Sequence, residues 1–135
     1  TGAIISYAIL SGSYFYGTNL RHANLIGTDL VYTYLTDADL TDADLTGANL
    51  TDAFLTNADL TDAILVSANL TNADLTGANL TGANLTDAIL TNADLTDAIL
   101  TNADLTNADL KNLQNLSKAK LCKTTLPWGV DNSGC

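Results

Sequence analysis

The chain has 135 residues, 47% of them hydrophobic, and a formal net charge of −10 at pH 7. This length suits a single domain, and no apolar run approaches the roughly 18–20 residues that cross a bilayer, so membrane insertion is not expected. Fourteen Asp against Arg21 give residues 1–110 a charge of about −13, which argues against direct binding to nucleic acid.

A five-residue repeat begins at Ile5 and continues to Leu110. The residue at every fifth position is almost always Leu, and Ala usually stands two residues before it. Neither an α-helix nor a simple β-strand would bring these Leu residues to one face. A coil that turns a corner every five residues does so, with Leu and Ala inside and Asp, Asn and Thr outside. We therefore predict a solenoid of stacked coils joined by backbone hydrogen bonds.

The run A-(D/N)-L-T-(D/N/G), as in residues 38–42 and 73–77, resembles the pentapeptide-repeat family. The resemblance covers residues 3–112 and implies an all-β solenoid, a right-handed quadrilateral β-helix with four repeats per coil. Residues 1–112 would then form 22 repeats in about 5.5 coils. Residues twenty apart would lie above one another on one side of the solenoid.

The N-terminal third departs from the repeat. Phe15 replaces an inner Leu, and the inner Ala is replaced by Ser13, Thr18, Thr28 and Thr33. Outward aromatic residues align on one side, with two more beside them, and the candidate partner surface comprises Tyr14, Tyr16, Tyr32, Tyr34 and Phe54. These rings either stabilise neighbouring strands, by about 0.2–1 kcal/mol per pair, or form a docking surface for a protein. The first coil has no evident cap, so the N-terminal end is a second possible contact.

A second candidate surface is acidic, with Asp39 aligned with Asp59 and Asp42 with Asp62. We expect these carboxylates to raise one another's pKa. Solubility is a sufficient explanation for them. Cation binding is the alternative, but outward side chains on a convex surface do not converge on an ion such as Ca²⁺, so we predict no metal site.

Catalysis has little support in this sequence. The single histidine, His22, falls at an outward corner. A solenoid filled by Leu and Ala offers no pocket in which a nucleophile, a base and an orienting acid could converge. We predict no catalytic residues, no cofactor and no enzyme activity.

Residues 113–135 are expected to form a C-terminal cap. The repeat ends at Leu110, and Leu113, Leu116 and Leu121 follow at near-helical spacing. We predict a short amphipathic α-helix within residues 112–121 that covers the last coil. An irregular tail follows, marked by Pro127.

Cys122 and Cys135 are the only cysteines. An even pair in a short terminal segment indicates a disulfide and an oxidising compartment, with two reduced thiols as the alternative. The tail also resembles that of exported pentapeptide-repeat proteins of photosynthetic bacteria, which end in a small helix and a disulfide-closed tail. No signal peptide is recognisable, but a chain that starts almost in register fits a removed leader. We expect the periplasm or thylakoid lumen rather than the cytoplasm.

These features predict a non-enzymatic scaffold or protein-binding module with an unidentified protein partner. The alternative comes from another branch of the family, in which an acidic coil mimics DNA and binds DNA gyrase or topoisomerase. The absence of loop insertions and the closed tail argue against that alternative. Fold alone does not separate the two.

Overall fold

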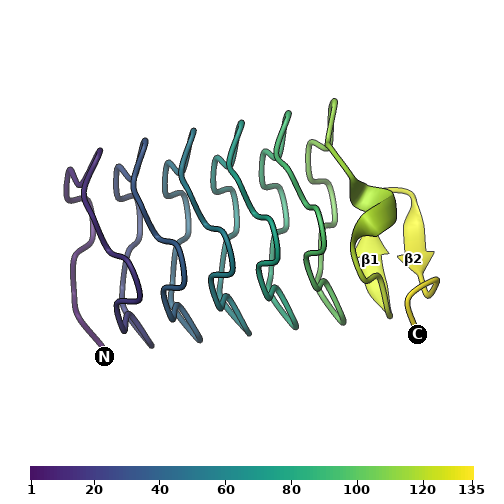
Figure 1. Ribbon diagram of the computed structural model, residues 1–135, viewed down its shortest axis with the longest axis horizontal. Coiled ribbons are helices and arrows are strands. Elements are labelled where there is room, and N and C mark those ends of the chain that lie inside the picture. Colours follow the sequence, from purple (N-terminus) through teal and green to yellow (C-terminus); the bar gives the residue numbers. More distant parts are fainter.

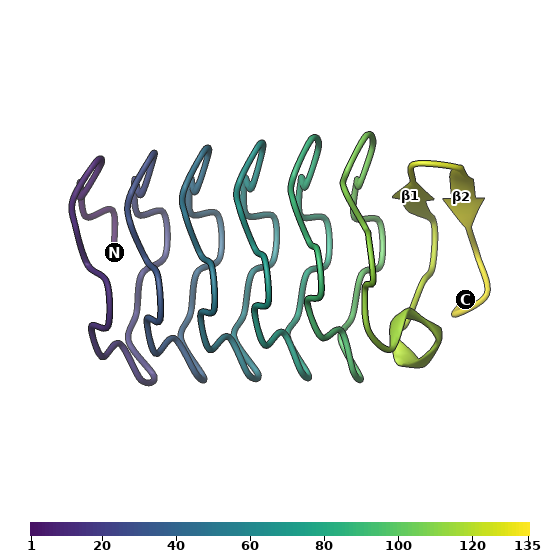
Figure 2. The same ribbon diagram turned by 90° about the horizontal axis from the view of Figure 1, so that it is seen from above.

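The computed structural model describes residues 1–135, which form a solenoid of stacked coils (Figures 1 and 2). Every fifth residue from Ile4 to Gln114 takes part in a parallel bridge to the residue twenty positions before or after it. Four such contacts per coil confirm the predicted four-sided β-helix. The longer elements all lie near the C-terminus: the 3₁₀ helix η1 (Leu116–Lys118) and the strands β1 (Thr124–Leu126) and β2 (Gly129–Asp131).

Each corner of a coil depends on one residue in the left-handed backbone conformation. This residue follows each inner Leu by two positions, for example Asp37 with φ of 58° and Gly77 with φ of 67°. Gly adopts this conformation without strain, and Asp and Asn tolerate it better than other residues. The next N–H closes the turn, as when Ala38 donates to the carbonyl of Leu35 at 3.0 Å. The frequent Gly, Asp and Asn at this position of the repeat thus follow from the left-handed conformation of the corner.

Leu and Ala fill the interior, as predicted. Every inner Leu from Leu25 to Leu105 is at most 1% exposed, whereas inner residues of the first coil, such as Leu10 and Phe15, are half-buried. Thr28 and Thr33 replace inner Ala, and their hydroxyls donate to the carbonyls of Leu25 at 2.7 Å and Leu10 at 3.3 Å. No buried side-chain polar atom lacks a hydrogen-bond partner.

The predicted α-helical cap is wrong. The helical segment there is a single 3₁₀ turn, η1, and the coil continues beyond it through bridges from Ile99 to Lys120 and from Asp104 to Thr125. These bridges span twenty-one residues because η1 absorbs one extra residue after Gln114. Leu121 then takes an inner position and is 4% exposed. The stack therefore reaches past residue 112 into the segment expected to form a separate cap.

A small hairpin closes the C-terminal end. Strand β2 pairs antiparallel with β1, and β1 continues one side of the solenoid, so β2 is the outermost strand in Figure 1. A disulfide joins Cys122 to Cys135, as predicted, with their Cα atoms 4.7 Å apart. The Gly134 N–H donates to the Leu121 carbonyl at 2.7 Å and also holds the tail. None of the helical structure has the length and apolarity required to cross a membrane.

Candidate protein-binding surface

Three aromatic rings stack along one side of the solenoid. Tyr14, Tyr34 and Phe54 occupy the outward position just before an inner residue, and parallel bridges hold their backbones in register. The ring centroids of Tyr14 and Tyr34 are 4.7 Å apart with an interplanar angle of 1°, and those of Tyr34 and Phe54 are 4.7 Å apart at 9°. The coil spacing therefore dictates face-to-face stacking and directs the ring edges to solvent.

Tyr16 extends this stack around the adjoining corner. Its ring centroid lies 5.6 Å from that of Tyr34 and 6.0 Å from that of Tyr14, with tilted planes. Tyr14 is 71% exposed and Tyr16 is 56% exposed. We call Tyr14, Tyr16, Tyr34 and Phe54 the aromatic surface.

Tyr32, the fifth residue of the predicted group, lies apart from the aromatic surface and contacts none of its rings. It occupies a corner with φ of 54° and is 57% exposed. Asp52, one coil further along, raises the pKa of the Tyr32 hydroxyl through a hydrogen bond and through its charge. The structure thus brings four of the five predicted residues together.

The acidic surface is partly neutralised by Arg21, which the prediction did not consider. Arg21 lies 3.6 Å from Asp39 and 3.7 Å from Asp42, and Nδ1 of His22 lies 3.5 Å from Asp42. The expected rise in pKa is wrong for Asp39. Hydrogen bonds from Thr41, assisted by the charge of Arg21, hold the pKa of Asp39 below its usual range.

Asp59 and Asp62 follow one coil further along the same columns. Asp59 bridges Asp39 through the backbone, and its carboxylate accepts hydrogen bonds from the N–H and hydroxyl of Thr61 at 3.0 and 2.6 Å. Asp62 lies at a corner with φ of 54°. No group of three or more His, Cys, Asp or Glu side chains has an arrangement that could hold a metal ion.

A local hydrogen bond explains why Thr follows the inner Leu, a role that sequence reasoning missed. Ten repeats place Thr two residues after an outward Asp or Asn, and in nine of them that Asp or Asn accepts bonds from both the backbone N–H and the hydroxyl of the Thr. Asp44, for example, accepts both from Thr46, at 3.0 and 2.6 Å. The spacing D/N-x-T carries this signal, because such side chains cap their own turns. The outward Asp, Asn and Thr residues of these repeats are therefore structural.

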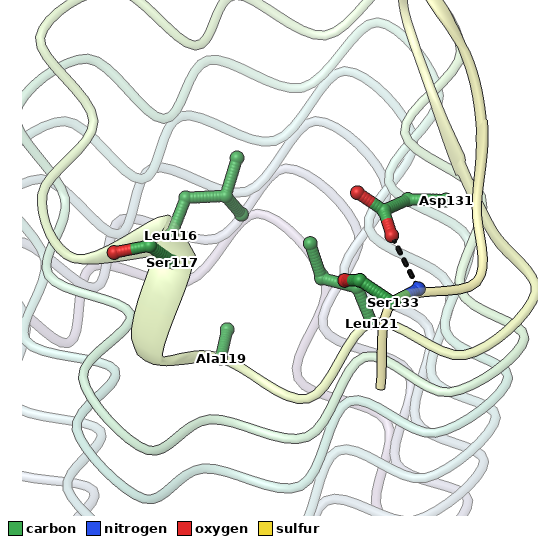
Figure 3. Close-up of a pocket in the computed structure, with 6 residues that line it drawn as sticks. All are labelled: Leu116, Ser117, Ala119, Leu121, Asp131 and Ser133. Carbon is green, nitrogen blue, oxygen red and sulfur yellow. Dashed lines mark hydrogen bonds between the residues drawn. The ribbon is translucent and has the colours of Figure 1, made fainter. Parts of the chain in front are cut away.

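The C-terminal end carries an open groove of 490 Å³ that the sequence did not predict. Figure 3 shows Leu116 and Ala119 on one wall and Leu121, Asp131 and Ser133 on the other. The Ser133 N–H donates to Asp131 at 2.7 Å and holds the pKa of that carboxyl below its usual range. The groove forms because the disulfide folds the tail back over the last coil, a contact that no repeat pattern encodes.

Comparison with protein families gives a match along most of the chain. A family model described as "Pentapeptide repeats" matches in eight copies, within residues 1–31, 18–57, 38–77, 55–92 and 88–126. No curated protein matches the chain.

Several solved structures resemble this one. A pentapeptide-repeat protein from the thylakoid lumen of Arabidopsis thaliana is 34% identical, with a TM-score of 0.71 over 73% of this chain and 68% of the other. HetL, a pentapeptide-repeat protein of the cyanobacterium Nostoc involved in heterocyst differentiation regulation, is 32% identical over 96% and 72% of the two chains, with a TM-score of 0.37. A pentapeptide-repeat protein of the cyanobacterium Cyanothece is 30% identical over 87% of both chains, with a TM-score of 0.37.

Proposed function

The chain belongs to the pentapeptide-repeat family, and from this premise we propose that it is a non-enzymatic protein-binding module. Its aromatic surface contacts the partner. The observation that carries this proposal is a connected cluster of four aromatic rings in which Tyr34 is half-buried and contacts the other three, which are exposed. The other outward side chains of the solenoid are mostly Asp, Asn and Thr. Exposed Tyr rings are typical of the residues that dominate binding energy in protein interfaces.

The two interpretations of the aromatic rings are compatible. Stacking between coils orders Tyr14, Tyr34 and Phe54 before any partner arrives. A rigid set of side chains loses little conformational entropy on binding. Structural stabilisation by these rings therefore favours their use in binding.

We further propose that the protein acts in an oxidising compartment, the thylakoid lumen or the periplasm. The Cys122–Cys135 disulfide supports this location, because cytosolic thiols are kept reduced. The thylakoid-lumen origin of the 34% identical neighbour agrees with it. A thiol titration of the unfolded, unreduced protein from its native source should find no free thiol. Two free thiols would contradict an oxidising location.

Affinity capture from exported and cytosolic fractions of the source cell tests the binding proposal. The bait is the unmodified protein beside a variant with Tyr14→Ser, Tyr34→Ser and Phe54→Ser. A matched control replaces Ile64, Ile89 and Ile99 by Ser, since these apolar residues occupy the same repeat position on the other three sides.

We expect a protein from the exported fraction that binds the unmodified protein and the control but not the aromatic variant. Equal capture by all three baits would contradict a role for the aromatic surface. Capture of gyrase or topoisomerase from the cytosol, unaffected by the aromatic changes, would instead support the acidic DNA-mimic function.

A further inference from the structure

The aromatic surface ends at a carboxylate. Phe54 is the last ring of the stack, and the residue twenty positions further along the same column is Asp74, bridged to Phe54 through the backbone. Tyr34 covers one face of the Phe54 ring, no ring covers the other, and Phe54 is 37% exposed. We call the face of Phe54 that no other ring covers its uncovered face. This face and the short Asp74 side chain beside it form the Phe54–Asp74 step.

Two threonines hold the carboxylate of Asp74 in place. One oxygen, Oδ1, accepts a hydrogen bond from the Thr76 N–H at 3.0 Å, and Oδ2 accepts one from the Thr56 hydroxyl at 2.9 Å. Although partial burial pushes the pKa of Asp74 upward, these bonds together hold it below the usual range. The group is therefore ionised and oriented at neutral pH.

No cation of this chain neutralises Asp74. The ion pairs of the molecule involve only Arg21 and His22, which lie against Asp39 and Asp42. The charged group that acts on Asp74 is Asp94, one coil further along the column, and its like charge raises the pKa of Asp74. The step therefore combines an uncovered aromatic face with an unneutralised negative charge.

Among protein side chains, arginine matches both features. Its planar guanidinium stacks on aromatic faces and donates hydrogen bonds to carboxylates in the same plane. Lysine satisfies the charge but cannot stack in this way. A carboxylate that already accepts two hydrogen bonds retains lone pairs for a further donor.

We infer that the Phe54–Asp74 step binds an arginine side chain of the protein partner. The guanidinium lies on the uncovered face of Phe54 and donates to Asp74, while Tyr14, Tyr16 and Tyr34 contact the surrounding partner surface. This inference rests on the proposed function and names the chemistry of the partner at one position.

Nuclear magnetic resonance titration with N-acetyl-arginine amide tests the inference directly. The expected result is a saturable shift of the Phe54 ring protons and the Asp74 carboxyl carbon, with upfield ring-current shifts of the ligand side chain. N-acetyl-citrulline amide, which has nearly the same shape without the charge, should cause no comparable shift. N-acetyl-lysine amide should bind more weakly than the arginine compound.

Two variants and two internal controls make the test specific. Phe54→Leu and Asp74→Asn should each weaken binding about threefold or more, which is the scale of an exposed cation–π contact. Retained amide spectra establish that both variants are folded. The Ile9–Asp29 and Ile89–Asp109 pairs place a carboxylate after an aliphatic residue in the same register, and their resonances should not shift.

Equal binding of citrulline or lysine, or equal shifts at Asp29 and Asp109, would overturn the inference. Such a failure is distinguishable from failure of the proposed function. Capture of a partner that depends on Tyr14, Tyr34 and Phe54 would still stand, and only the arginine contact would be lost.

Discussion

The middle coils and the N-terminal coils share one backbone but differ in what they carry. Residues 36–110 repeat nearly one sequence, and their inner Leu and Ala residues are almost completely buried. In residues 3–35 the inner positions include Ser13, Thr33 and the half-buried Phe15, and the outward positions include Tyr14 and Tyr34. Ser13, Phe15 and Thr33 lie on the side of the solenoid that carries Tyr14 and Tyr34, whereas the inner Thr18 and Thr28 lie on two other sides.

This difference indicates that one region of a repeat protein can supply most of the stability while another carries the residues that select a partner. The uniform middle supplies local, additive interfaces between coils, as expected for solenoids. Where Thr replaces an inner Ala, its buried hydroxyl needs a hydrogen-bond acceptor, as when Thr33 donates to the carbonyl of Leu10. The aromatic surface consists of residues that depart from the outward Asp, Asn and Thr of the repeat, so such departures mark the candidate site, whereas the uniform repeats carry no such signal.

The largest expected effect separates the interiors of the two regions. Leu75→Ala should lower the free energy of unfolding by about 2–5 kcal/mol, because a completely buried Leu leaves a cavity. Leu10→Ala should cost less, about 1–2 kcal/mol, because this residue is half-buried. Urea unfolding monitored by circular dichroism measures both. Equal losses would show that the two interiors are equally packed. Thr76→Ala serves as a control at an outward position, and its expected cost in unfolding free energy is small.

Removing one inner hydroxyl tests the polar interior of the N-terminal coils. Thr28→Val keeps the side-chain shape but loses the hydrogen bond to the Leu25 carbonyl at 2.7 Å. We expect a loss of about 1 kcal/mol. Thr86→Val loses an outward bond to Asn84 at 2.7 Å, where water can substitute, and should cost less. If Thr28→Val were more stable than the unmodified protein, the hydroxyl of Thr28 would destabilise the fold.

The aromatic stack should contribute modestly to stability. Tyr34→Leu breaks contacts with two stacked rings and should cost about 1 kcal/mol. Tyr32→Leu, at a corner without ring contacts, is the matched change and should cost little. Thermal unfolding of both variants measures the difference. A loss of several kcal/mol at Tyr34 would make the ring mainly structural and weaken it as a binding residue.

The smallest effect concerns pH and acts mainly on the middle coils, because residues 1–28 contain no Asp. Hydrogen bonds from Thr96 and Asn115 hold the pKa of Asp94 below its usual range. A group with a depressed folded pKa adds stability above its unfolded pKa, about 3.9 for Asp, and loses this stability as the pH falls from there through the folded pKa. Asp94→Asn should flatten this part of the profile measured by urea unfolding. An unchanged profile would contradict the contribution of Asp94.

Much of the fold was predictable because one residue in five is buried Leu and the corners accept Gly, Asp and Asn. The twenty-residue spacing of Tyr14, Tyr34 and Phe54 likewise predicts that they align in one column, as the bridges between them show. The end of the chain was not predictable in this way. Leu113 and Leu116 are three residues apart, a spacing that suits a helix face and also a 3₁₀ turn between two inner positions. The local sequence does not distinguish the helix from the turn. The bridges that favour the turn join Ile99 to Lys120 and Asp104 to Thr125, and both partners lie beyond it.

Other parts of the candidate surface depended on contacts between columns. Tyr32 and Tyr16 both lie near the stacked column in sequence, yet only Tyr16 contacts its rings. Arg21 pairs with Asp39 and Asp42 although neither lies in its own repeat. Side-chain direction at a corner decides such contacts, and a periodicity argument specifies the column but not that direction.

Because four repeats complete one coil, the number of repeats also sets the angle around the solenoid axis between features at its two ends. Gaining or losing four repeats would lengthen or shorten the rod by one coil and leave every column in phase. Gaining or losing a single repeat between the aromatic surface and the hairpin would turn one relative to the other by a quarter of a revolution. Evolution could thus change the angle between two ends of this molecule without altering a single contact type, much as the spacing between two sites on DNA sets the direction in which each one faces.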